Sequence, residues 1–312
     1  MDIALTLVVN PGCSFSLEKI IAQVRDLNGH EPDIRILSEA KAADLIYKVA
    51  AADATSEATE SATNRATLAT FTRTLSPPLN SISGLDWCLG SEKYRKKRLI
   101  LADMDSTMIT VECIDELADF IGLKDKVAAI TEAAMRGELD FEGALTERVA
   151  LLKGLSRDAL ERCYNERISL MGGARILVQT MKKHGAQAVL VSGGFTYFTE
   201  RVAAAIGFDV HRANVLEFNG DALSGTVQHP ICGAQTKLDT LLEYRDKLGI
   251  ETRDILAVGD GANDIPMIEA AGLGVAYHAK PKTQAAAAAA VRFGDLTTLL
   301  YYQGFSDNEF VS

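Results

Sequence analysis

Short apolar runs that alternate with helical patterns dominate the chain from residue 99 onward. Four runs have the length and apolar content of buried strands, and they lie at residues 99–102, 188–191, 255–258 and 274–277. Strands that are apolar on both faces are typical of a parallel sheet covered by helices on both sides. The pattern therefore predicts an α/β fold whose core is a doubly wound, largely parallel sheet.

A long insertion separates the first two of these strands. Residues 112–166 carry several amphipathic helical patterns and no strand signal, so we expect a helical cap over the carboxyl edge of the sheet. Further on, Asn219-Gly220-Asp221 separates apolar residues at 215–218 and 223–227, which predicts a β-hairpin. The alanine-rich run at 285–290 predicts a helix, because alanine has the highest helix propensity.

The first 85 residues predict a separate, small α/β domain without catalytic motifs. The elements expected in it are a strand from Ile3, a helix from about Ser16, a strand near Ile34 and a helix after Ser38.

The connection between the two domains has a different composition. Residues 50–74 are rich in Ala, Ser and Thr, which predicts either a helix of low core content or a mobile stretch. Pro77-Pro78 and Ser83-Gly84 are typical of a linker segment that leads into the next domain. We therefore expect residues 86–98 to link the small domain to a sheet domain at 99–312.

Charge and cysteine content exclude several classes of protein. The 312 residues carry a formal net charge of -10 and a pI near 5.1, whereas nucleic acids and anionic membranes demand a basic surface. The five cysteines are scattered without a C-x-x-C pair, which argues against a disulfide framework or a thiolate metal site. Asp2 stands where a signal peptide is basic, and no apolar segment reaches membrane-spanning length. These features predict a cytoplasmic chain that binds neither nucleic acid nor membrane.

Two carboxylates follow the first strand of the sheet domain directly. Asp103 and Asp105 are one residue apart after the apolar run, so both side chains can share one cleft if the chain stays extended. A pair of this kind can divide nucleophilic attack and proton transfer between its members.

Three further segments carry candidate site residues. Two of them follow later strands, and the third opens a helix. Ser192-Gly193-Gly194 offers a hydroxyl and close backbone N–H groups for phosphoryl oxygens, although an ordinary strand-to-helix turn has the same pattern. Lys237 opens a helical stretch and could neutralise a phosphoryl group, or it could be a solvated lysine. Asp260 and Asp264, in Gly-Asp-Gly-Ala-Asn-Asp, supply the hard oxygen ligands that Mg²⁺ prefers; the alternative is a glycine-rich turn with capping residues.

These four segments, in this order and spacing, resemble the four motifs of the haloacid dehalogenase superfamily, and within it the phosphoserine phosphatases. The resemblance covers residues 99–294. It implies a Rossmann-like core, a helical cap inserted after the first core strand, dependence on Mg²⁺ and an aspartyl-phosphate intermediate.

The resemblance also implies roles for residues around the phosphoryl group. Asp103 is the expected nucleophile, and Asp105 the general acid that later activates water. Asp103, Asp260 and the backbone carbonyl of Asp105 would hold Mg²⁺. The supporting roles implied are Asp264 in the outer shell, orienting a metal-bound water or Lys237; Thr107 fixing the loop; Lys237 offsetting charge; and Ser192, Gly193 and Asn263 binding or lining the phosphoryl site.

The cap is expected to select the substrate. By the same resemblance, Glu112 would bind an ammonium group and Arg148 an α-carboxylate, and their charges suit those partners. Met135 and Phe141 would form apolar walls, although core packing explains them equally well. By composition alone, the two charged residues would be ordinary helix-surface positions.

The function implied is Mg²⁺-dependent hydrolysis of O-phospho-L-serine to L-serine and phosphate, the last step of serine biosynthesis. A phosphatase or phosphotransferase of the same superfamily acting on another small phosphorylated metabolite is the alternative. A regulatory binding protein that has lost catalysis is a third reading, which the intact set of charged motif residues disfavours. The first 85 residues resemble an amino-acid-binding ACT domain only distantly; a regulatory or dimer-forming role is expected there, with a homodimer as a possible assembly.

Overall fold

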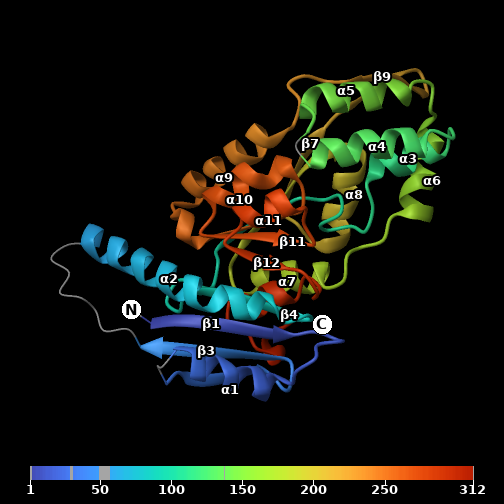
Figure 1. The fold of residues 1–312 in the computed structure, drawn as a ribbon. Helices are drawn as coiled ribbons and strands as arrows, with labels where there is room; N and C mark the ends of the chain where they lie inside the picture. The colour runs from blue at the N-terminus through green and yellow to red at the C-terminus, as the bar shows by residue number, and fades with distance from the viewer. Residues whose placement is uncertain (1, 29–30, 49–56, 137, 312) are drawn as a thin grey trace.

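The computed structural model describes residues 2–28, 31–48, 57–136 and 138–311 (Figure 1). Its main sheet has ten strands in the order β2-β3-β1-β4-β12-β11-β10-β5-β6-β7. The first four strands of this order belong to the N-terminal unit, and the last six belong to the sheet domain. The predicted fold class, an α/β protein with a mostly parallel core sheet and an inserted helical cap, is confirmed.

The N-terminal unit is an antiparallel sheet with two helices on one face. Its elements are β1 (Asp2–Val9), α1 (Leu17–Asn28), β2 (Asp33–Ser38), β3 (Ala42–Lys48), α2 (Glu57–Asn80) and β4 (Leu85–Ser91). Alternate residues of β1, namely Ile3, Leu5 and Leu7, point into the core beneath the helices. This unit therefore has an apolar core of its own.

Three predictions for this region are wrong. The helix expected after Ser38 is strand β3, which is buried on both faces between β1 and β2 and so lacks the alternation of a half-buried strand. Pro77-Pro78 lies inside α2 instead of a linker. The linker expected at residues 86–98 begins with β4, which pairs with β1 along seven residues. Of the two alternatives for residues 50–74, the helix is present from Glu57 onward in α2, while 49–56 lie outside the described residues.

The sheet domain contains the four predicted parallel strands. They are β5 (Leu99–Ala102), β6 (Gln187–Phe195), β10 (Ile255–Gly259) and β11 (Leu273–Tyr277), joined at the edges by β7 (Val210–Asn214) and β12 (Ala289–Val291). Alternate residues of the strands enter two separate apolar clusters, one on each face of the sheet. The helices on the two faces are α7 (Ala174–Lys183), α8 (Thr196–Ile206) and α12 (Thr298–Tyr302) on one, and α9 (Ala234–Leu248) and α10 (Ile265–Ala270) on the other.

The predicted helix at residues 285–290 is wrong for most of its length. Helix α11 (Pro281–Ala286) ends within the alanine run, and β12 then pairs with β11. Pairing with a sheet edge outweighs the helix propensity of alanine here. On its other side β12 pairs with β4 at Ala290 and Trp87, and this contact joins the two sheets into one.

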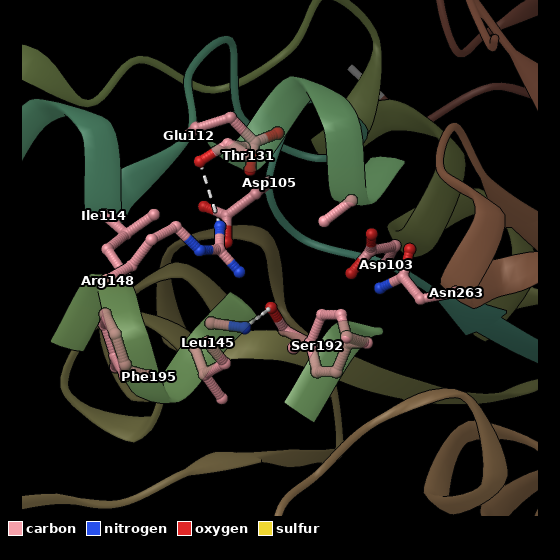
Figure 2. Close-up of a pocket in the computed structure, with 14 residues that line it drawn as sticks. Asp103, Asp105, Glu112, Ile114, Thr131, Leu145, Arg148, Ser192, Phe195 and Asn263 are labelled. Carbon is pink, nitrogen blue, oxygen red and sulfur yellow. Dashed lines mark hydrogen bonds between the residues drawn. The ribbon is translucent and has the colours of Figure 1, made fainter. Parts of the chain in front are cut away.

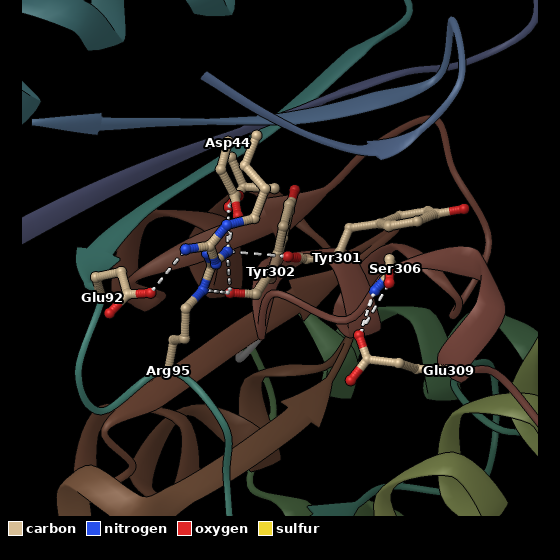
Figure 3. Close-up of polar contacts among 9 residues, drawn as sticks. Asp44, Glu92, Arg95, Tyr301, Tyr302, Ser306 and Glu309 are labelled. Carbon is tan, nitrogen blue, oxygen red and sulfur yellow. Dashed lines mark hydrogen bonds and ion pairs between the residues drawn. The ribbon is translucent and has the colours of Figure 1, made fainter. Parts of the chain in front are cut away.

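A buried ion pair also joins the N-terminal unit to the sheet domain (Figure 3). The Arg95 guanidinium contacts both carboxylate oxygens of Asp44 at 2.6 and 2.9 Å, and it donates to the carbonyls of Tyr301 and Tyr302 at 3.1 and 3.3 Å. Asp44 is fully buried and Arg95 nearly so. The Arg95 side chain thus fixes β3 of the N-terminal unit to the end of α12.

The cap stands over the carboxyl edge of the sheet (Figure 1). It contains the predicted helices, as α3 (Cys113–Asp119), α4 (Lys124–Met135), α5 (Phe141–Leu151) and α6 (Arg157–Arg167). The predicted hairpin is confirmed as β8 (Leu216–Asn219) and β9 (Ala222–Val227), and it lies against α5. Backbone hydrogen bonds between Leu223 and both Gly154 and Leu155 make the hairpin part of the cap. Among the described residues, no helix combines the length and apolar character that crossing a bilayer needs.

Candidate active site

The carboxyl end of β5 and a tight turn position the two motif carboxylates. The Asp103 N–H donates to the Val258 carbonyl at 3.0 Å, so the backbone stays paired as far as Asp103. The chain then turns, with Ser106 in the left-handed region at φ 54° and three N–H groups converging on the Met104 carbonyl. This turn brings Asp105 back over the same cleft as Asp103.

Lys237 links two carboxylates beneath that cleft. Its Nζ lies 2.7 Å from Asp103 Oδ1 and 2.6 Å from Asp264 Oδ1, with no exposed surface. Burial lowers the pKa of Lys237, but the two carboxylates outweigh burial and raise it above its usual range. The predicted alternative of a solvated lysine is therefore wrong.

Asp264 organises the glycine-rich loop after β10. Its Oδ2 accepts the N–H groups of Asp260 and Gly261 at 3.1 and 3.0 Å, while its Oδ1 contacts Lys237. Asp260 in turn accepts the hydroxyl of Thr107 at 3.2 Å. Asp264 and Thr107, the two residues expected in supporting roles, are thus in contact with charged groups of the site.

Carboxylate oxygens of Asp103, Asp260 and Asp264 lie within 4.8 Å of one another. All three carboxylates are buried, and the Lys237 ammonium group contacts two of them, Asp103 and Asp264, so acidic groups outnumber the cation in this cluster. Burial and the charge of Asp264 raise the pKa of Asp103 to about 7 even though Lys237 pulls it down. Hard oxygen donors and uncompensated negative charge fit a divalent cation.

A pocket opens on the other side of Asp103, between the sheet and the cap (Figure 2). The predicted residues that line it are Asp103, Asp105, Glu112, Phe141, Arg148, Ser192, Gly193 and Asn263. Four other predicted residues are buried next to the site without lining this pocket, namely Lys237, Asp260, Asp264 and Thr107. Met135 ends α4, and its side chain lies outside the described part of the structure.

Two adjacent glycines let side chains approach the backbone near the end of β6. A Cβ on Gly194 would lie 2.5 Å from Asp105 Oδ2, and one on Gly193 would lie 2.6 Å from the Phe141 ring. The Gly194 N–H donates to Ser192 Oγ at 2.8 Å, which fixes the hydroxyl beside the pocket. The sequence Ser-Gly-Gly is therefore more than an ordinary turn, because larger residues would displace an acid or a cap residue.

Asp105 and Glu112 have raised pKa values in this pocket. Burial raises the pKa of Asp105 to about 6, helped by the charge of Asp103 and opposed by hydrogen bonds from Cys113. Burial, together with the nearby Asp105, raises the pKa of Glu112 to about 8. Ser106 donates to Glu112 at 2.5 Å and fixes its carboxylate. A cation that entered the pocket would favour the charged form of Glu112.

Arg148 is a buried cation without an ion-pair partner among the described residues. It is 4% exposed, and its Nε and one terminal nitrogen donate to the Ala144 carbonyl at 3.1 Å and to Thr131 Oγ1 at 2.9 Å. The other terminal nitrogen points into the pocket (Figure 2). A buried guanidinium in this state favours an anionic ligand.

Sequence reasoning assigned no role to several residues of the pocket wall, namely Ile114, Thr131, Ala134, Leu145 and Phe195. Phe195 directly follows the recognised Ser-Gly-Gly motif, so its position was a usable signal. Thr131 has no such signal, because the residue it contacts lies 17 positions further along the chain.

A family model for haloacid dehalogenase-like hydrolases matches residues 100–269, which include all of the charged motif residues. The chain belongs to the haloacid dehalogenase-like hydrolases. Curated relatives in this family share the sequence: a phosphoserine phosphatase of Polaromonas sp. is 50% identical over 208 residues, 65% of this chain and 88% of that protein. Another, from Haemophilus influenzae, is 45% identical over 210 residues, 67% of each chain.

Solved structures of haloacid dehalogenase-like hydrolases share the fold. A family hydrolase from Salmonella enterica serovar Typhi has a TM-score of 0.79 at 28% identity and covers 97% of this chain and 98% of that one. A phosphoserine phosphatase solved as an analogue of its phospho-aspartyl intermediate has a TM-score of 0.64 at 38% identity, over 66% of this chain and 99% of that one. The first similarity includes the N-terminal unit, since it covers nearly the whole chain.

Proposed function

We propose that this chain hydrolyses O-phospho-L-serine to L-serine and phosphate. The observation that carries the proposal is Arg148, a buried cation that faces the pocket without an ion pair among the described residues. Glu112 and Asp103 line the same pocket. A small phosphate ester that bears both an ammonium and a carboxylate matches this distribution of charge.

In this proposal the cap side of the pocket orients the substrate. Arg148 binds the α-carboxylate through its inward-pointing nitrogen, and Glu112 binds the ammonium group. Phe141 lies on Gly193 and closes the pocket from the cap side, which excludes water from the phosphoryl group. The phosphoryl group is then directed toward Asp103 and the Ser192 segment.

The chemical step uses the two carboxylates in turn. Asp103 Oδ1 is held by Lys237 and by the Met104 N–H, so we assign the attack on phosphorus to Oδ2. As the new O–P bond forms, the bond from phosphorus to the seryl oxygen breaks and Asp105 gives that oxygen its proton. Water then attacks the aspartyl phosphate, Asp105 takes a proton from it, and phosphate leaves with Asp103 restored.

Mg²⁺ is the cation proposed for the carboxylate cluster, held by Asp103, Asp260 and the backbone carbonyl of Asp105. When bound, it would neutralise charge on the phosphoryl oxygens. Asp264 keeps both oxygens engaged with Lys237 and backbone N–H groups, which supports an outer role for it. Ser192, Gly193 and Asn263 border the pocket where those oxygens would lie.

The five cysteines are free thiols, which supports a reducing compartment such as the cytoplasm and a place in serine biosynthesis there. The regulatory or dimer-forming role of the N-terminal unit and the homodimer stay predictions.

A phosphate-release screen tests the proposal. The purified chain is assayed against phosphorylated metabolites with and without Mg²⁺, and phosphoserine is expected to give the highest kcat/KM, with activity lost on chelation. Comparable or faster hydrolysis of metabolites that lack the amino acid group would contradict the substrate. Transfer of phosphate to an added alcohol, in place of release, would contradict hydrolysis.

Arg148→Ala gives a sharper test of recognition. The change should cost about 2–5 kcal/mol of transition-state binding for phosphoserine and clearly less for O-phosphoethanolamine, which lacks the carboxylate. Both substrates are measured as kcat/KM with the wild-type protein alongside. Equal losses on the two substrates would refute the role of Arg148.

A further inference from the structure

Thr131 connects Arg148 to Asp115, a carboxylate that has no direct hydrogen bond to Arg148. It lies on α4, is 3% exposed, and accepts a hydrogen bond from Arg148 at 2.9 Å. The same hydroxyl lies 2.6 Å from Asp115 Oδ1 on α3. Three residues from three cap helices therefore form one continuous chain of hydrogen bonds.

The direction of the chain follows from the chemistry of its members. A guanidinium only donates, so Thr131 Oγ1 must accept from Arg148 and use its single proton elsewhere. That proton has two acceptors, Asp115 at 2.6 Å and the Val127 carbonyl at 3.1 Å. The shorter, charge-assisted bond to Asp115 is the stronger of the two. The order is thus Arg148 to Thr131 to Asp115.

This arrangement leaves the arginine charge available. Thr131 on one side and the Ala144 carbonyl on the other fix the guanidinium plane, and the remaining terminal nitrogen points into the pocket (Figure 2). Asp115 contributes negative charge through the hydroxyl instead of by direct contact. A carboxylate bound directly to the guanidinium would compete with a carboxylate on the ligand.

We propose that Thr131 and Asp115 are positioning residues that set the preference for substrates with an α-carboxylate. The inference rests on the proposed function, since it assigns to these two residues the orientation of Arg148 toward the substrate. Neither residue touches the reacting atoms.

Thr131→Val tests the inference because it keeps the shape of the side chain and removes the hydroxyl. The kcat/KM for phosphoserine should fall at least about tenfold more than that for O-phosphoethanolamine, mainly through KM. Thr131→Ser should restore most of the difference, and Asp115→Asn should lose part of it. O-Phosphoethanolamine is measured as a substrate and as a competitive inhibitor of p-nitrophenyl phosphate hydrolysis. Thr146→Val, an exposed threonine on α5, is the matched control.

An Arg148→Met background separates positioning from a general effect on folding. If Thr131 acts through Arg148, adding Thr131→Val to Arg148→Met should change the substrate preference less than about twofold. A full, additive loss in that background, or equal losses on both substrates for Thr131→Val alone, would overturn the inference. A wild-type protein without preference for phosphoserine would instead overturn the proposed function, and this inference with it.

Discussion

Among single residues, Lys237 is the cation in direct contact with carboxylates of the site. It is completely buried, and it contacts Asp103 and Asp264 at nearly equal distances. Removing a buried charge costs more than the pair contributes, because the partner carboxylates keep their desolvation without compensation. The lysine is therefore needed for the folded state as well as for the reaction proposed here.

Replacing this lysine should affect stability and activity together. Lys237→Met is expected to lower the free energy of unfolding by about 3–5 kcal/mol, since two carboxylates lose their buried cation. The kcat for phosphate release should fall by about 100-fold or more, because charge on the phosphoryl group is no longer offset. Urea denaturation and phosphate release measure the two effects. Lys247→Met, at an exposed position of the same helix, is the control, and wild-type values for Lys237→Met would contradict the account.

At the scale of elements, the end of β6 and the turn after β5 approach more closely than ordinary side chains allow. Asp105 Oδ2 occupies the space where Gly194 would carry a Cβ, and Phe141 of the cap does the same at Gly193. The strand, the acid and the cap therefore depend on each other at one point. A strand glycine normally weakens a sheet, so its presence here indicates close approach.

Gly194→Ala should uncouple these elements without unfolding the protein. The added methyl group must displace Asp105, so kcat with phosphoserine is expected to fall by about 100-fold, the size of a lost general acid. Gly90→Ala in β4 is the matched control, since nothing lies within 4 Å of its added Cβ. Circular dichroism checks the fold. Normal turnover by Gly194→Ala would show that Asp105 tolerates displacement and does not transfer the proton.

The same scale shows how far the sequence predicts the structure. Apolar runs such as 99–102 and 255–258 are confirmed as strands because parallel strands are buried on both faces, which leaves a continuous apolar signature. β3 is also buried on both faces, although its pairing is antiparallel, and a helix was predicted there instead. Its sequence carries two alanines and Asp44, which weaken the continuous apolar signature. β12 was missed because its partner strands decide its conformation.

The candidate site could be predicted where motifs are contiguous. Asp103 and Asp260 directly follow β5 and β10, and Ser192 lies near the carboxyl end of β6, so topology alone brings them to one edge of the sheet. Thr131 and the pairing of Arg95 with Asp44 depend on contacts between distant segments, for which a single sequence has no periodic signal.

For the whole molecule, the two units share one sheet and a buried ion pair. β4 pairs with β12 across the boundary, and Arg95 ties Asp44 of β3 to the carbonyls of Tyr301 and Tyr302. Buried pairs of this kind stabilise one arrangement, because any other leaves a charge without a partner. The N-terminal unit and the sheet domain should therefore unfold together.

Arg95→Met tests this coupling. The change leaves Asp44 buried without its cation, and the free energy of unfolding should fall by about 3–5 kcal/mol. The fluorescence of Trp87, which lies in β4 at the boundary, and circular dichroism should report one coincident transition in the wild-type protein. Arg35→Met removes a partly exposed pair with Glu92 and should cost less than about 1 kcal/mol. Separate transitions in the wild type, or equal effects of both changes, would contradict the coupling.

Trapping of the acyl phosphate tests the central claim, attack on phosphorus by Asp103, most directly. The protein is mixed with phosphoserine and Mg²⁺, quenched in acid during turnover and reduced with borohydride, which converts an aspartyl phosphate to homoserine. Peptide mass spectrometry should find homoserine at position 103 in the wild type and none there in Asp103→Asn, which should also lose turnover. Conversion at a different carboxylate, or near-normal turnover by Asp103→Asn, would contradict the account.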